Sequence, residues 1–156
     1  NKYYVDYVFT NKSNEYSLEI ADSLLQDNNF NLQIMFNSLT GNRKTIYFDL
    51  DKWNIRPDAA IDLAKVLDVL QQHPTMKIDI RSHTDSRQTH AYNQKLSDRR
   101  AKSTMQWLIS KGISADRLTA KGYGETQLVN KCADGVPCSE AEHQLNRRSQ
   151  FIITAL

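Results

Sequence analysis

The sequence predicts an α+β fold, a two-layer sandwich with two main helices on one face of a small mixed sheet. Two long segments show helical periodicity, and short aromatic or β-branched runs stand before, between and after them. The order is β-α-β-α-β-β. The 156 residues carry 20 Lys and Arg against 18 Asp and Glu. This balance excludes a disordered polyampholyte and a strongly basic protein, so we expect no nucleic-acid partner.

The first part of the chain differs in composition from the rest. It is rich in Asn, Ser and Tyr, and we expect residues 1–43 to be an arm or the tail of a preceding domain. Residues 44–156 form the main domain. Within the arm, alternation predicts strands at Tyr3–Phe9 and Asn31–Phe36. Ser17–Leu25 fits either a short helix or a further strand.

The first half of the main domain predicts a strand, a helix and a second strand. Thr45–Phe48 is typical of a buried strand, and Pro57 suits the first turn of a helix. This helix ends before Pro74, and its apolar side chains recur at helical spacing: Ala60, Leu63, Ala64, Leu67 and Leu70. Met76–Ser82 then alternates with period two, which indicates a strand with one buried face.

The second half predicts a long helix and two closing strands. A polar loop, 83–91, leads into a helix from about Tyr92 to Lys111, which Gly112 ends. Strands are expected at Leu118–Tyr123 and Arg148–Thr154. Between them, Ser139 and Glu142 have the spacing of a capping box, which predicts a short helix.

An acidic and a basic residue converge on the long helix. Asp85 lies just after the second strand, and Arg100 is seven residues after Asn93, so the two helix residues lie within about 20° of each other. Arg99 is turned away from them. A fixed carboxylate beside a fixed guanidinium can bind a zwitterion. The same spacing fits a structural salt bridge between Asp85 and Arg100 equally well.

Two cysteines, Cys132 and Cys138, flank an Asp-Gly turn. We expect them to form a loop-closing disulfide in an oxidising compartment, and two free thiols are the alternative. Two thiols without further Cys or His make a poor zinc site.

Asn1 in place of Met indicates a processed or excised piece of a longer protein. The apolar runs are too short to span a bilayer.

Catalytic and metal functions fit the sequence poorly. His83, Asp85 and Ser86 are the residue types of a hydrolytic triad, but they are crowded together and no Gly-x-Ser-x-Gly turn occurs. His83 and His90 could bind a metal with Asp85, but no second cluster completes that site. We therefore expect no catalytic residue, no metal and no cofactor, and a hydrogen bond for the His83 side chain near the strand end.

Five motifs together resemble the OmpA-like peptidoglycan-binding domain of OmpA-type porins and of the peptidoglycan-associated lipoprotein. In chain order they are residues 46–56 (IYFDLDKWNIR), 82–85 (SHTD), 92–101 (YNQKLSDRRA), 122–125 (GYGE) and 146–148 (NRR). The cysteine insertion is similar to those of Bacteroidetes envelope proteins. The resemblance implies non-catalytic binding of the diaminopimelate residue in the stem peptide, at the periplasmic face of the outer membrane. The missing parts of the parent chain would reach that membrane.

The resemblance also implies roles for single residues. Asp85 takes the position that meets the diaminopimelate ammonium group, and Arg100 takes the position that meets its carboxylate. The remaining matched positions line, brace or support the pocket: Thr84, Asn93, Leu96, Ala101, Asp49, Leu50 and Arg147. A protein-docking or anchoring module of the stator or secretion type is the alternative function. The sequence leaves open whether the protein is a homo-oligomer.

The chain departs from the family pattern at two loop positions. Ser82 stands where the family usually has Gly, and residues 87–89 (RQT) stand where it commonly has a Gly. Because Gly adopts positive φ without strain, the geometry of this loop depends on how the replacements are accommodated.

Overall fold

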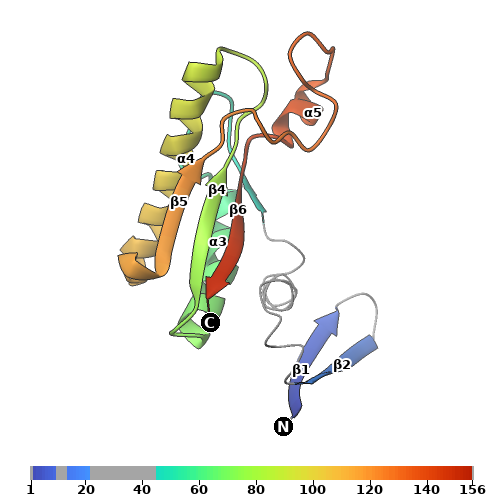
Figure 1. Ribbon diagram of the computed structural model, residues 1–156, viewed down its shortest axis with the longest axis vertical. Helices are drawn as coiled ribbons and strands as arrows, with labels where there is room; N and C mark the ends of the chain where they lie inside the picture. Colours follow the sequence, from blue (N-terminus) through green and yellow to red (C-terminus); the bar gives the residue numbers. More distant parts are fainter. Residues whose placement is uncertain (1, 10–13, 22–44, 156) are drawn as a thin grey trace.

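The computed structural model describes residues 2–9, 14–21 and 45–155. Its main sheet has four strands in the order β3-β6-β4-β5 (Figure 1). The strands are β3 (Thr45–Tyr47), β4 (Lys77–Ser82), β5 (Leu118–Gly122) and β6 (Arg148–Ala155). β6 is antiparallel to both β3 and β4, whereas β4 and β5 are parallel, so the sheet is mixed as predicted.

Two long helices pack on one face of this sheet, behind it in the view of Figure 1. They are α3 (Pro57–Gln72) and α4 (His90–Ser110), and α4 begins where the side chain of Thr89 accepts the backbone N–H of Tyr92. A single 3-10 turn (Ala115–Arg117) precedes β5, and α5 (Glu140–Gln144) opens with the predicted capping box. The α+β class and the order of elements are confirmed.

The core lies between the sheet and the two helices. Its buried side chains come from both layers: Ile46, Phe48, Ala59, Leu63, Val66, Val69, Leu70, Met76, Ile78, Ile80, Leu108, Ile113, Leu118, Phe151 and Ile153. The predicted stripe of α3 was partly wrong, since Ala64 is exposed while Val66 and Val69 are buried. The face rotated toward the sheet is the one with larger side chains, because these bury more apolar surface than alanines.

Gly122 at the end of β5 allows the closest approach between the sheet and α4. A Cβ atom at this position would lie 2.3 Å from the backbone nitrogen of Asp98 and 2.3 Å from Oγ of Ser97. The backbone N–H of Gly122 also donates to the Asp98 carboxylate at 3.0 Å. The glycine of this motif is therefore required by packing against the helix backbone.

Gly122→Ala is expected to lower the free energy of unfolding by about 3 kcal/mol, because the added methyl group forces β5 and α4 apart. Urea unfolding measures this. Gly112→Ala is the comparison variant. Its Cβ would meet nothing within 4 Å, so any loss there comes only from the φ of 101° and should be smaller than for Gly122→Ala. An unfolding free energy for Gly122→Ala equal to that of the unmodified protein would contradict the close approach.

The N-terminal residues that the structure describes form a separate two-stranded sheet. β1 (Lys2–Phe9) and β2 (Asn14–Ala21) are antiparallel, with Tyr7 opposite Tyr16. The strand expected at Tyr3–Phe9 is confirmed, and residues 17–21 of the ambiguous segment form a strand. The strand expected at Asn31–Phe36 lies outside the described residues. Among the helices described, none combines the length and apolarity that a membrane crossing needs.

Candidate ligand-binding site

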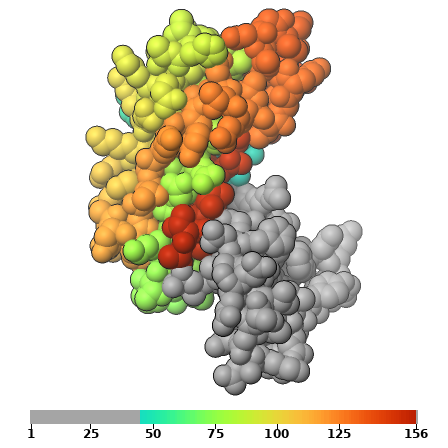
Figure 2. All heavy atoms as spheres, in the orientation of Figure 1, coloured from blue at the N-terminus to red at the C-terminus, as the bar shows by residue number. Residues whose placement is uncertain are grey.

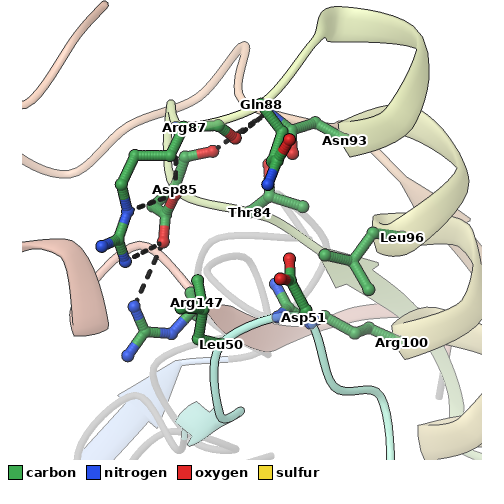
Figure 3. Close-up of a pocket in the computed structure, with 10 residues that line it drawn as sticks. All are labelled: Leu50, Asp51, Thr84, Asp85, Arg87, Gln88, Asn93, Leu96, Arg100 and Arg147. Carbon is green, nitrogen blue, oxygen red and sulfur yellow. Dashed lines mark hydrogen bonds and ion pairs between the residues drawn. The ribbon is translucent and has the colours of Figure 1, made fainter.

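A pocket opens where β4 ends and α4 begins. Its space is about 190 Å³, counting the part that is open to solvent. Its walls come from the loop after β3, the loop after β4, the first turns of α4 and the residue before β6 (Figure 3). The lining residues are Leu50, Asp51, Thr84, Asp85, Arg87, Gln88, Asn93, Leu96, Arg100 and Arg147.

Arg100 is fully buried. Its guanidinium group lies over the ring of Phe48, 5.2 Å from the centroid, and donates hydrogen bonds to three backbone carbonyls. Nε donates to the carbonyl of Lys52 at 2.8 Å, Nη1 to that of His83 at 3.0 Å and Nη2 to that of Asp49 at 3.0 Å. Within residues 45–155, no carboxylate forms an ion pair with it. Arg100 thus contributes a positive charge to the pocket that no described anion neutralises.

The charge of Arg100 persists at neutral pH. Burial, and after it the charge of Arg147, lowers the pKa of Arg100 to about 10, while Asp85 and Asp51 act in the opposite direction. The helix-face prediction is confirmed, because Arg100 shares the buried face with Asn93 and Leu96. Arg99 is exposed and lies over the ring of Trp53 instead, 4.8 Å from its centroid.

Asp85 is buried and pairs with two arginines, neither of which is Arg100. Its Oδ1 accepts the backbone N–H of Arg87 at 3.0 Å, and its Oδ2 accepts Nη2 of Arg87 at 2.9 Å and Nη1 of Arg147 at 3.1 Å. The salt bridge between Asp85 and Arg100 that the spacing also allowed is not formed. Burial raises the pKa of Asp85, but the hydrogen bonds from Arg87 and Arg147 outweigh this and lower it overall.

Glu140 at the start of α5 completes a cluster of alternating charges. It pairs with Nη1 of Arg87 at 2.9 Å and with Nη1 of Arg147 at 2.8 Å, so both arginines bridge two carboxylates. Hydrogen bonds from Arg87 and then Arg147 lower the pKa of Glu140. A cation that approaches Asp85 would therefore share the carboxylate with these arginines, which can retain Glu140 as their partner.

Most of the other predicted residues line the pocket. Thr84, Leu96, Leu50 and Arg147 do so. Figure 3 shows Leu96 and Arg100 extending from α4, and Thr84 on the loop that also carries Asp85. Oγ1 of Thr84 is buried and has no hydrogen-bond partner among the described residues. The pocket therefore offers one free hydroxyl group beside its charged groups.

Asn93 also lines the pocket and shapes its upper loop. Its Nδ2 donates to the carbonyl of Arg87 at 2.9 Å and to that of Asp85 at 3.3 Å.

Two of the predicted site residues do not line the pocket. Asp49 contributes only its carbonyl, because its carboxylate is 59% exposed and pairs with Arg56. Ala101 is buried outside the lining.

Three lining residues were missed from the sequence: Asp51, Arg87 and Gln88. Two of them have a positive φ, 54° at Asp51 and 80° at Gln88. Gln88 lies in the segment where the family commonly has Gly. The absence of that glycine was therefore the sequence signal that could have identified a residue with positive φ in this loop. Ser82 needs no positive φ, because it is the last residue of the extended strand β4. Its hydroxyl group forms a hydrogen bond with the hydroxyl group of Ser149.

The disulfide between Cys132 and Cys138 is present, with Cα atoms 5.9 Å apart. The predicted turn is confirmed by Gly135, whose φ is 77°. This loop supports the pocket directly, because the hydroxyl of Ser86 donates to the carbonyl of Cys132.

The side chain of His83 does not form the hydrogen bond expected for it, since neither ring nitrogen has a partner of good geometry in the described part of the chain. Its ring stacks on Tyr123 instead.

Comparison with known proteins places the chain in a family. Residues 47–141 match the model of the OmpA family. Outer membrane porin F of Pseudomonas fluorescens is 38% identical over 110 residues, which are 70% of this chain and 32% of the porin. The peptidoglycan-associated lipoprotein of Brucella melitensis is 40% identical over 87 residues, which are 56% of this chain and 52% of the lipoprotein. The chain thus spans about half or less of these relatives.

Solved structures share the fold. The peptidoglycan-associated lipoprotein from Burkholderia pseudomallei has a TM-score of 0.66 at 27% identity, over 76% of this chain and 95% of that one. The cell wall anchor of the T6SS from Pseudomonas aeruginosa has a TM-score of 0.59 at 27% identity, over 72% of this chain and 80% of that one. The family model covers more than half of the sequence, and these solved structures have the same fold. The chain belongs to the OmpA family.

Proposed function

We propose that this protein binds peptidoglycan without catalysis, through the diaminopimelate residue of the stem peptide, and so anchors an outer-membrane protein to the cell wall. The observation that carries the proposal is the buried guanidinium of Arg100, which faces the pocket with no anionic partner among the described residues. A buried charge of this kind favours a ligand carboxylate. Relatives named for peptidoglycan or cell-wall association support the same assignment.

The two ends of the diaminopimelate zwitterion have separate partners in this pocket. Its carboxylate pairs with Arg100, and its ammonium group approaches Asp85, whose pKa is lowered and whose charge therefore persists at neutral pH. The methylene chain of the ligand packs against Leu96 and Leu50. In this proposal the domain binds the wall at the periplasmic face of the outer membrane, and the rest of the parent chain provides the membrane attachment. Relatives named as an outer membrane porin and as peptidoglycan-associated lipoproteins support an envelope location.

Thr84→Val tests the pocket without removing a charge. Valine has nearly the shape of threonine, and the Thr84 hydroxyl has no partner in the described structure, so the free energy of unfolding should stay constant or rise by up to ~1 kcal/mol. Binding to purified sacculi should weaken about 5–10-fold, because a ligand hydrogen bond of about 1 kcal/mol is lost. Sedimentation with sacculi and urea unfolding measure the two effects.

Thr84→Ser is the matched control, because it retains the hydroxyl and should bind as the unmodified protein does. Equal sacculus binding by the valine and serine variants would exclude ligand contact at Thr84. The same sedimentation experiment separates the alternative function. A module that only docks proteins stays in the supernatant, whereas a wall-binding domain is found in the pellet.

A further inference from the structure

Three side chains with metal-ligating groups meet beside the pocket but outside it. His90 is the first residue of α4, Glu125 follows β5, and Asp134 lies in the disulfide loop. The ring nitrogen of His90 and one carboxylate oxygen from each acid all lie within 4.8 Å of one another. Figure 2 shows the segments they come from, the yellow-green start of α4 and the orange loops, side by side at one end of the molecule.

Glu125 is the unusual member of this group. Its side chain is only 7% exposed, and Oε1 accepts no hydrogen bond from the described residues. The polar contact recorded for this oxygen is with Nδ1 of His90, whose side chain is 84% exposed. A buried carboxylate is costly unless a cation or hydrogen-bond donors compensate it. The imidazole of His90 is the described group that contacts this oxygen, and a metal ion held between His90 and Asp134 would compensate the same carboxylate.

One imidazole nitrogen and two carboxylate oxygens are a donor set that Zn²⁺ accepts, with water in the fourth position. Two ligand atoms about 2.1 Å from one ion lie at most about 4.2 Å apart, so the observed spacing needs only small shifts. His90 and Asp134 are exposed and free to make them. Ca²⁺ and Mg²⁺ prefer all-oxygen sets with more ligands. The cluster of Cys132, Cys138 and Glu142 offers no alternative, because its two sulfur atoms form the disulfide.

We propose that His90, Glu125 and Asp134 form a zinc site that ties together the three segments around the pocket. The loop after β5 is already bonded to the pocket loop, since the backbone N–H of Thr84 donates to the carbonyl of Gly124 at 2.9 Å. The disulfide loop is bonded to the pocket loop through Ser86 and Cys132. Bound zinc would link the loop after β5 and the disulfide loop directly to the first residue of α4. The site stands independently of what the pocket binds.

Calorimetric titration of the full chain, prepared without a polyhistidine tag and stripped with a chelator, tests the proposal with Zn²⁺ alone. The expected result is a 1:1 complex with Kd on the order of 10 μM and a rise in Tm on zinc addition. His90→Asn and Asp134→Asn should each weaken binding at least ~10-fold. Both residues are exposed, so these variants should fold even if Glu125→Gln does not.

His73→Asn is the matched control, because His73 lies at the other end of the domain after α3 and should not affect zinc binding. Zinc binding that is equal in His90→Asn and the unmodified protein overturns the proposal. So does the absence of binding at millimolar zinc, which would leave the contact between His90 and Glu125 as an ion pair only. Tighter binding of Ca²⁺ than of Zn²⁺ would also overturn it.

Discussion

Arg100→Ala is expected to abolish binding to sacculi and to lower the free energy of unfolding by about 3–5 kcal/mol. The helix stripe alone suggests a variant that loses binding and keeps full stability. The structure changes this expectation, because the guanidinium joins the carbonyls of Lys52, Asp49 and His83 from two loops. Its removal leaves these buried or half-buried acceptors without their donor, which is the costly way to break hydrogen bonds. Sedimentation with sacculi and urea unfolding measure both effects.

Two further variants serve as comparisons for Arg100→Ala. Arg99→Ala should change both quantities by less than ~1 kcal/mol, because Arg99 is exposed and contacts only the ring of Trp53 among the described interactions. Arg100→Lys keeps a positive charge but cannot reach three carbonyls at once, so it should fold with partial stability and bind weakly. Wild-type binding by Arg100→Lys would contradict the role of the planar guanidinium, and equal losses for Arg99→Ala and Arg100→Ala would contradict the assigned helix face.

His83 is expected to make the protein lose about 3 kcal/mol of stability between pH 6.5 and pH 4. Its side chain is buried at 1% exposure. Burial first, and then the charge of Arg148, lowers the pKa of His83 from 6.5 to about 4, while Gln150 offsets this only in part. The unfolded chain therefore binds a proton below pH 6.5 that the folded protein does not bind until about pH 4. Stability is complete above pH 6.5 and falls as the pH decreases through this window.

His83→Phe tests this prediction, because phenylalanine can still stack on Tyr123 but does not titrate. Urea unfolding at pH 7, 5.5 and 4.5 should show a much smaller fall for this variant. His73→Asn, which removes a histidine elsewhere, should behave as the unmodified protein does. The account of His83 is wrong if His83→Phe loses as much stability as the unmodified protein. Below about pH 4 a further loss is expected in both proteins, as Asp85 and Glu140 become protonated.

The fold was predictable because its signals are local. Pro57 at the start of α3, the capping box at Ser139 and the period-two alternation before Ser82 each act within a few residues, and each element formed as expected. The inward face of α3 was harder to predict. Its apolar residues fit two overlapping stripes, and only contact with the sheet selects the stripe with Val66 and Val69.

The site was predictable only in part, because ion pairing depends on contacts between distant segments. Helical spacing placed Arg100 beside Asn93, and this was confirmed. The partners of Asp85 are Arg87, from its own loop, and Arg147, which is 62 residues away. No pattern in the sequence indicates that Glu140 joins both arginines. Local spacing therefore identified the charged residues but not how they pair.

Calorimetric titration of the chain with free diaminopimelate, with lysine as the comparison ligand, tests the central claim most directly. Lysine has the same ammonium-bearing side chain but lacks the second zwitterionic centre. We expect diaminopimelate to bind with Kd in the range of about μM to mM and lysine to bind at least ~10-fold more weakly. Arg100→Lys should reduce this difference, because lysine lacks the carboxylate that pairs with Arg100, whereas Asp85→Asn should weaken both ligands. Equal affinity for the two ligands, or no binding of diaminopimelate at millimolar concentration, would contradict the claim.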